Sequence, residues 1–212
     1  MEENQIEFDE IITTKKHNTN QQESQFPKPK FLSEQEEKIT AAQKGTLLHL
    51  CMQKLDNRKD YTLQEIKDLI SQMRLKNQIT EMQYEAINAN KVYKFTQNEI
   101  WQRIKTAKAV QKEKAFYINI PIAQVYEEAK ESDLQGDILV QGIIDLYFID
   151  ENNKLVLLDY KTDYVEAGQE NLLVQKYKVQ LDLYKNALEG SLKRKVDEVY
   201  IYSTYLDRLL KI

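Results

Sequence analysis

Residues 155–161 read Leu-Val-Leu-Leu-Asp-Tyr-Lys, a run of apolar residues that ends in an acid and, two positions later, a lysine. Upstream, the run Gly142-Ile143-Ile144-Asp145 places a second acid at the end of another apolar stretch. The intervening Asp-Glu-Asn-Asn at 150–153 is typical of a turn. We therefore expect two strands, at 138–149 and 154–161, joined as a hairpin.

The pairing within this hairpin follows from its centre. If the turn is centred on Asn152, antiparallel partners have residue numbers that sum to about 304, which places Asp145 opposite Asp159 with Cβ atoms roughly 5 Å apart. Lys161 then lies on the same face as Asp159, because it is two residues further along the strand. The opposite face is expected to carry six core residues: Ile144, Leu146, Phe148, Val156, Leu158 and Tyr160.

Two carboxylates this close repel each other unless a cation lies between them. Oxygen ligands of this kind suit Mg²⁺ or Mn²⁺, which polarise a phosphodiester and lower the pKa of a bound water. Lys161 is placed to orient or deprotonate that water, or to stabilise the charge that develops on the phosphate. The pattern favours metal-dependent phosphodiester hydrolysis, and the alternative is a surface hairpin with an ordinary ion pair.

Two helical pairs add candidate residues. His49 lies four residues after Gly45 on the same helix face, and its imidazole suits a third metal ligand, for Mn²⁺ better than for Mg²⁺. Gln180 and Tyr184 have the same spacing on a later helix, where Gln can position a catalytic group and Tyr can stack on a base or bind a phosphate. Ordinary packing remains the alternative for both pairs.

Around these motifs the sequence predicts an α+β fold. Residues 1–30 are polar and typical of a tail or linker, and residues 31–212 are expected to form one domain. That domain is helical from about 40 to 112, and a sheet with a helix follows from about 115 to 212. Four helix starts show a capping box, a Thr with Gln or Glu three residues later: Thr40/Gln43, Thr62/Glu65, Thr80/Gln83 and Thr96/Glu99.

The second half is expected to hold two more strands, at 116–122 and 196–204. A helix with apolar residues at helical spacing is predicted over 172–188, and Gly190 is expected to end it. Together with the hairpin, these elements predict a small mixed sheet flanked by helices.

Composition narrows the class of protein. The 212 residues carry a net charge of −4, which argues against a basic nucleic-acid coat, although clusters of Lys and Arg leave room for a local basic groove. A single cysteine, Cys51, excludes an internal disulfide and a cysteine-built metal site, and it favours a reducing, cytoplasmic setting. The apolar runs are too short to cross a bilayer and the first residues lack a signal-peptide pattern, so no membrane partner is expected.

Taken in order, four motifs resemble those of the RecB-type nucleases of the PD-(D/E)xK superfamily: Gly45-x-x-x-His49, Gly142-x-x-Asp145, Asp159-x-Lys161 and Gln180-x-x-x-Tyr184. Finer runs at 140–145 and 157–163 look like the C-terminal nuclease domains of the AddA family of helicase–nucleases. The resemblance covers about residues 27–212 and implies a restriction-endonuclease-like core.

The resemblance also implies a role for each motif. The implied ligands of Mg²⁺ or Mn²⁺ are His49, Asp145, Asp159 and the Tyr160 carbonyl. Catalysis is assigned to Lys161 with the two acids, and the supporting or DNA-binding residues are Gly45, Gln180 and Tyr184. The implied activity is exonucleolytic cleavage of single-stranded DNA delivered by a helicase, in double-strand-break repair by recombination.

The implied partners are DNA, a helicase portion of the same polypeptide and an AddB-like subunit. The chain has no Walker A motif, so it corresponds to an excised domain or a free-standing relative. A catalytically silent domain of the same fold, which only binds DNA or docks on another protein of the complex, is the alternative function. The intact set of two acids and a lysine favours the enzyme, since a silent copy would be free to lose them.

Overall fold

Helices come first along the chain and the sheet follows, as the sequence predicts. The computed structural model describes residues 39–122 and 136–212, and the predicted tail at 1–30 lies outside them. The early helices are α2 (Ala41–Lys54), α3 (Leu63–Leu75), α4 (Glu81–Ala86), α5 (Ala89–Thr96) and α6 (Glu99–Lys105). The later elements are β1 (Ala109–Pro121), β2 (Asp137–Ile149), β3 (Leu155–Lys161), α8 (Glu170–Leu192), β4 (Glu198–Ser203) and β5 (Arg208–Lys211). Across the described ranges, no helix combines the length and the apolar composition needed to cross a membrane.

Threonine capping boxes start three of the early helices. Thr40, Thr62 and Thr80 each accept a hydrogen bond from the backbone three residues on, and the Gln or Glu there bonds back to the cap. The fourth predicted box is wrong, because Thr96 is the buried last residue of α5. Asn98 caps α6 instead, through its side-chain oxygen.

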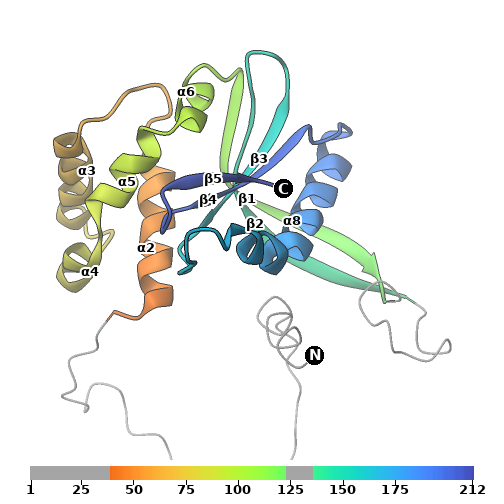
Figure 1. Cartoon of the computed structure of the whole chain (residues 1–212), viewed down its shortest axis with the longest axis horizontal. Coiled ribbons are helices and arrows are strands. Elements are labelled where there is room, and N and C mark those ends of the chain that lie inside the picture. Colours follow the sequence, from red (N-terminus) through yellow and green to blue (C-terminus); the bar gives the residue numbers. More distant parts are fainter. Residues whose placement is uncertain (1–38, 123–135) are drawn as a thin grey trace, which may run out of the picture. The chain divides into compact units, whose positions relative to one another are not determined.

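The five strands form one mixed sheet in the order β1-β2-β3-β4-β5. Neighbours are antiparallel except β3 and β4, which run parallel with α8 as the connection between them. Figure 1 shows α8 on one side of the sheet and the early helices on the other. Because β3 and β4 are parallel, their C-terminal ends lie at the same edge of the sheet, where the Asp-x-Lys motif ends.

Two predicted boundaries need correction, and one strand was missed. The first strand begins at Ala109 rather than at residue 116, and β5 was not predicted. The last helix does not end at Gly190 but continues to Leu192, because Lys193 takes the left-handed backbone conformation (φ 52°) that stops it.

The hairpin between β2 and β3 has the predicted register. Leu146 pairs with Leu158 and Phe148 with Val156, and all four side chains are buried. This face of the sheet meets the early helices through an aromatic group, in which the Phe95 ring lies 5.0–5.5 Å from three others, those of Trp101, Tyr160 and Tyr202. Each such contact stabilises the fold by roughly 0.5–1.5 kcal/mol beyond burial.

Along β1 and β2, the side of the sheet to which alternate side chains point switches at one pair of facing residues. Lys112 reaches the early helices, where its ammonium donates to carbonyls at the C-terminal end of α2, whereas Phe116 packs beneath α8. Regular alternation would put residues 112 and 116 on one face. Glu113, which stands opposite Asp145 in the register, has a φ of 51° and breaks the alternation.

The same change of face moves Ile144. It was expected beside Leu146, but it packs in the core beneath α8 with Leu157 and Leu181. β1 and β2 thereby contribute side chains to both layers of the protein, and the break between the two layers falls at Glu113 and Asp145.

Candidate functional site

Helix α2 approaches the end of β3 closely because residue 45 is glycine. A Cβ at Gly45 would lie 3.0 Å from the Thr162 hydroxyl oxygen, tighter than ordinary van der Waals contact. The glycine thus permits a close approach, and its partner is the first residue after β3. One helical turn later, α2 places His49 beside the sheet.

Asp145 connects this helix to the hairpin. Its Oδ1 lies 3.2 Å from Nδ1 of His49, and its Oδ2 accepts a hydrogen bond from the backbone N–H of Tyr160 at 2.8 Å. The Tyr160 ring packs edge-on against His49, with centroids 5.6 Å apart. The predicted residues from the helix and from both strands of the hairpin are thus brought together.

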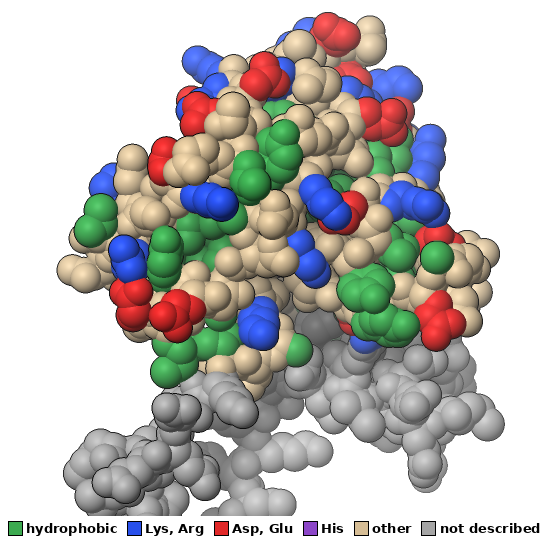
Figure 2. All heavy atoms as spheres, turned by 60° about the vertical axis from the view of Figure 1, so that its left-hand side comes forward, with side chains coloured by type: hydrophobic (Ala, Val, Ile, Leu, Met, Phe, Trp, Pro, Cys, Tyr) green, Lys and Arg blue, Asp and Glu red, His purple; other side chains and the backbone are tan. Residues whose placement is uncertain are grey.

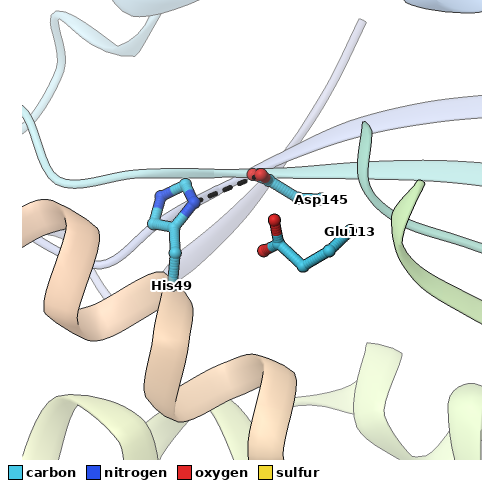
Figure 3. A group of neighbouring side chains, drawn as sticks. All are labelled: His49, Glu113 and Asp145. Atoms are coloured by element: carbon cyan, nitrogen blue, oxygen red, sulfur yellow. Dashed lines mark hydrogen bonds and ion pairs between the residues drawn. The ribbon is translucent and has the colours of Figure 1, made fainter. Parts of the chain in front are cut away.

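A third acid joins them from β1. The ligand atoms of His49, Glu113 and Asp145 all lie within 4.8 Å of one another, and Figure 3 shows the three side chains converging from α2, β1 and β2. Asp159 lies outside this group. Glu113 was not among the predicted site residues, because it stands between Lys112 and Lys114 in what looks like a basic cluster.

Asp159 and Lys161 form the neighbouring part of the site. Nζ of Lys161 lies 3.1 Å from Oδ2 of Asp159 and donates to Oε1 of Gln180 at 2.7 Å. Nε2 of Gln180 in turn donates to the Tyr184 hydroxyl at 2.8 Å. A chain of hydrogen bonds from α8 therefore fixes the lysine.

Tyr184 also packs, as its alternative interpretation expected. Its ring lies edge-on to Phe116 with centroids 5.2 Å apart. Gly142 makes room for this pair, since a Cβ there would lie 2.6 Å from the Phe116 ring and 3.4 Å from Tyr184. Packing and hydrogen bonding are both properties of this one side chain.

Two residues that the sequence did not single out surround the lysine. The Nζ of Lys161 lies 3.8 Å from the centroid of the Tyr177 ring, a cation–π contact. The Tyr177 hydroxyl donates to both carboxylate oxygens of Asp163, at 3.0 and 2.9 Å. Tyr177 and Asp163 line a hollow of about 340 Å³ together with His49, Glu113 and Lys161.

Negative charge accumulates in this site. Burial and the charge of Asp145 raise the pKa of Asp159 above its ordinary value, against the opposing effect of Lys161. Burial and Asp145 also raise the pKa of Glu113. Although burial of the ring opposes it, the hydrogen bond and charge of Asp145 raise the pKa of His49.

The donor set fits a divalent cation. Oδ2 of Asp159 is buried, and its partner among the described residues is the Lys161 ammonium 3.1 Å away, which forms an ion pair without the geometry of a hydrogen bond. Carboxylate oxygens are the ligands that Mg²⁺ prefers, and an added imidazole suits Mn²⁺ as well. A cation would relieve the repulsion among Glu113, Asp145 and Asp159.

Comparison with known proteins agrees with this arrangement. A family model described as the PD-(D/E)XK nuclease superfamily matches residues 21–207. The chain is 38% identical over 208 residues to one of the subunits of the ATP-dependent helicase/nuclease of Clostridium perfringens, covering 95% of this chain and 16% of that protein. Proteins of the same name match from a Thermoanaerobacter species (40% over 183 residues, 86% of this chain and 15% of that protein) and from Clostridium botulinum (36% over 206 residues, 96% and 16%).

The chain spans about a sixth of the length of these curated relatives. The family match covers most of the chain and includes every element that builds the site, from α2 to β4. A mixed sheet flanked by helices, with two acids and a lysine on adjacent strands, is the arrangement expected of that family. This chain therefore belongs to the PD-(D/E)XK nuclease superfamily.

Proposed function

We propose that this chain is the metal-dependent deoxyribonuclease domain of an ATP-dependent helicase–nuclease. Its substrate is single-stranded DNA delivered by the helicase part, and its task is exonucleolytic processing of double-strand breaks for recombination with an AddB-like subunit. The observation that carries the proposal is the meeting of His49, Glu113 and Asp145 next to the ion pair of Lys161 with Asp159, beside an open hollow that Glu113 and Lys161 line. The names of the curated relatives support the helicase and nuclease context.

Mg²⁺ or Mn²⁺ would be held by His49, Asp145 and Asp159, with the Tyr160 carbonyl as a further ligand. We add Glu113 to this set because its carboxylate lies within 4.8 Å of the ligand atoms of His49 and Asp145. When bound, the ion would supply Lewis-acid stabilisation of the phosphodiester and a more acidic water.

Lys161 is proposed to stabilise the charge that develops on the phosphate, or to orient the attacking water. Gln180 holds the lysine from one side and Tyr177 from the other, so the ammonium is positioned before substrate arrives. Tyr184 acts through Gln180 as a positioning residue. Preorganised charge of this kind removes the need to reorganise the site during the reaction.

From the surface charge we infer that another part of the protein supplies most of the affinity for DNA. Figure 2 shows Lys and Arg side chains interspersed with acidic ones over the face that it draws. The net charge of the chain is −4, and affinity for DNA comes largely from phosphate contacts. We therefore expect weak, salt-sensitive binding of DNA by this chain.

Cleavage of labelled oligonucleotides tests the proposal. The 212-residue chain is incubated with single-stranded and duplex DNA in Mg²⁺, in Mn²⁺ and in EDTA, beside Asp159→Ala. Asp182→Asn, which changes an exposed acid on α8, is the matched control. We expect metal-dependent cutting by the wild type and the control, with single strands preferred, and at least about a hundredfold less by Asp159→Ala.

Equal cutting by Asp159→Ala would reject the assignment of the site. No cutting in either metal, together with retained DNA binding, would favour the catalytically silent alternative.

A further inference from the structure

Two tyrosines remain exposed just beyond the catalytic end of β3. Tyr164 is 67% exposed and Tyr205 is 45% exposed, although their rings contact each other edge-on with centroids 4.7 Å apart. Burial against the core does not explain either side chain. An edge-on pair leaves ring surface open to a ligand.

The strand order fixes both tyrosines beside the catalytic lysine. Tyr164 follows Lys161 by three residues, a length of chain that spans at most about 10 Å. Tyr205 follows Ser203 by two residues, and Ser203 is the ladder partner of Lys161 in the parallel pair β3–β4. The Thr204 N–H also donates to the Lys161 carbonyl at 2.9 Å. Both rings thus stand at the edge of the sheet where β3 delivers Asp159 and Lys161.

The surface beside the two tyrosines adjoins the hollow of the proposed catalytic site. A second hollow of about 300 Å³ is lined by Tyr164, by Leu172 and by Asp163, and Asp163 also lines the hollow of the catalytic site. Leu172 is 57% exposed, so apolar surface extends beyond Tyr164. A strand whose phosphodiester enters the catalytic hollow would pass directly over this surface.

One lysine lies beside the aromatic surface, whose hollow is also lined by the acids Asp163 and Glu166. Nζ of Lys91 lies 5.8 Å from the centroid of the Tyr205 ring, and Lys91 forms no ion pair with the residues that the structure describes. Aromatic rings beside an uncompensated lysine are the combination that binds single-stranded nucleic acid without sequence preference. In a duplex the base faces are covered by their neighbours, so such a surface favours single strands.

We infer that Tyr164 and Tyr205 form a base-stacking platform for single-stranded DNA next to the phosphodiester that is cut, with Lys91 on a neighbouring phosphate. The inference rests on the proposed function and adds to it the way in which the strand is held. Stacking on tyrosine accepts every base, so the platform gives preference for single strands without preference for sequence.

Binding measured in EDTA, where no cleavage occurs, tests the platform separately from catalysis. Fluorescence anisotropy of a labelled oligothymidylate of about 12 nucleotides is titrated at low salt with the wild type, Tyr164→Ala, Tyr205→Ala and Tyr164→Phe. Tyr117→Ala is the matched control, because Tyr117 is 69% exposed but lies on β1. Thermal unfolding of each variant confirms that it is folded.

We expect Tyr164→Ala to weaken binding by between about fivefold and a hundredfold, the range for loss of one base–aromatic stack. Tyr205→Ala should weaken it less, while Tyr164→Phe and Tyr117→Ala should bind as the wild type does. An oligonucleotide of abasic sites should bind the wild type more weakly, and Tyr164→Ala should then make no further difference. Unchanged binding of oligothymidylate by Tyr164→Ala overturns the platform.

The two proposals fail in different ways. A chain that cuts nothing in any metal removes the proposed function, whereas the anisotropy result in EDTA still decides the platform. Hydrolysis of thymidine 5′-(p-nitrophenyl phosphate), which is too small to extend over the platform, should be the same for Tyr164→Ala and the wild type. Loss of that activity in Tyr164→Ala would contradict a role confined to binding.

Discussion

Two groups of acidic side chains lie on or next to the strands of the same sheet, and their surroundings differ. At one end of β2, Asp150 and Glu198 are paired with positively charged side chains. Arg103 donates hydrogen bonds to both, at 2.8 and 2.7 Å, and Lys154 donates to Glu198 at 2.8 Å. We call these four residues the paired network. The other group lies a few residues back along β2, and we propose that it is catalytic and call it the catalytic group. Its three carboxylates, those of Glu113, Asp145 and Asp159, have Lys161 and His49 as neighbours.

The pKa values of the two groups move in opposite directions. Although burial opposes it, hydrogen bonds from Lys154 and Arg103 lower the pKa of Glu198 to about 2, and Arg103 likewise lowers that of Asp150. In the catalytic group, burial and neighbouring acid raise the pKa values of Asp159 and Glu113. A buried acid with a lowered pKa is already neutralised by the protein, whereas one with a raised pKa has capacity for a cation. We therefore expect the first group to stabilise the fold and the second to bind a cation.

The largest effect should come from substituting two acids five residues apart, Asp145 in β2 and Asp150 directly after it. Asp145→Asn keeps an oxygen for the Tyr160 N–H but removes charge, so we expect cleavage to fall at least about a hundredfold without loss of stability. Asp150→Asn should do the reverse, lowering the free energy of unfolding while the folded protein still cuts. Initial cleavage rates and urea unfolding of both variants measure the contrast. Loss of stability in Asp145→Asn without loss of cleavage would contradict the difference proposed between the catalytic group and the paired network.

Removal of the arginine from the paired network should have the next largest effect. Arg103→Met leaves two buried carboxylates, Asp150 and Glu198, without their shared partner, which should lower the free energy of unfolding by about 3 kcal/mol. Arg74→Met is the control, because its pair with Glu81 is exposed and should contribute about 0–1 kcal/mol. Denaturant unfolding measures both changes. Similar values for the two variants would show that the network is not structurally important.

The smallest effect concerns pH. Because the folded pKa of Glu198 lies at about 2, below its unfolded value, the stability that it contributes is present at neutral pH and is lost as pH falls from about 4.5 toward 2. Without metal, Asp159 has the opposite effect on stability. Because its pKa is raised in the folded state, its ionisation costs more there than in the unfolded chain, so the folded state loses stability as pH rises. Glu198→Gln should therefore flatten the acid limb of an unfolding profile measured in EDTA. An unchanged acid limb would contradict the role of Glu198.

The parts of the fold that the sequence predicted depend on local signals. The capping boxes at Thr40, Thr62 and Thr80 involve residues three apart, and the hairpin register involves a short turn. The meeting of Asp145 with the Asp-x-Lys strand followed from that register alone. Such short-range patterns can be read from one sequence because few alternatives compete with them.

The features that were not predicted from the sequence depend on long-range contacts or on unusual backbone conformations. Glu113 meets Asp145 across a pairing of distant segments, and its left-handed conformation breaks the alternation that would have marked the start of β1. The box at Thr96 failed because Asn98, two residues later, offered a competing cap and Thr96 was drawn into the core. β5 is four residues long and adds to an existing edge, so it has little pattern of its own.

Helix α2 is anchored at both of its ends. Near its start Gly45 touches Thr162, and at its finish Lys112 binds the last carbonyls, so the helix is a spacer of fixed length between β3 and β1. A slide of one residue along its axis would shift His49 by about 1.5 Å and turn it by about 100°, and would break an anchor. The imidazole therefore cannot be adjusted by itself. Any partner that regulates this site through α2 must displace the whole helix, and such a displacement would move the proposed metal ligand His49 in a single step.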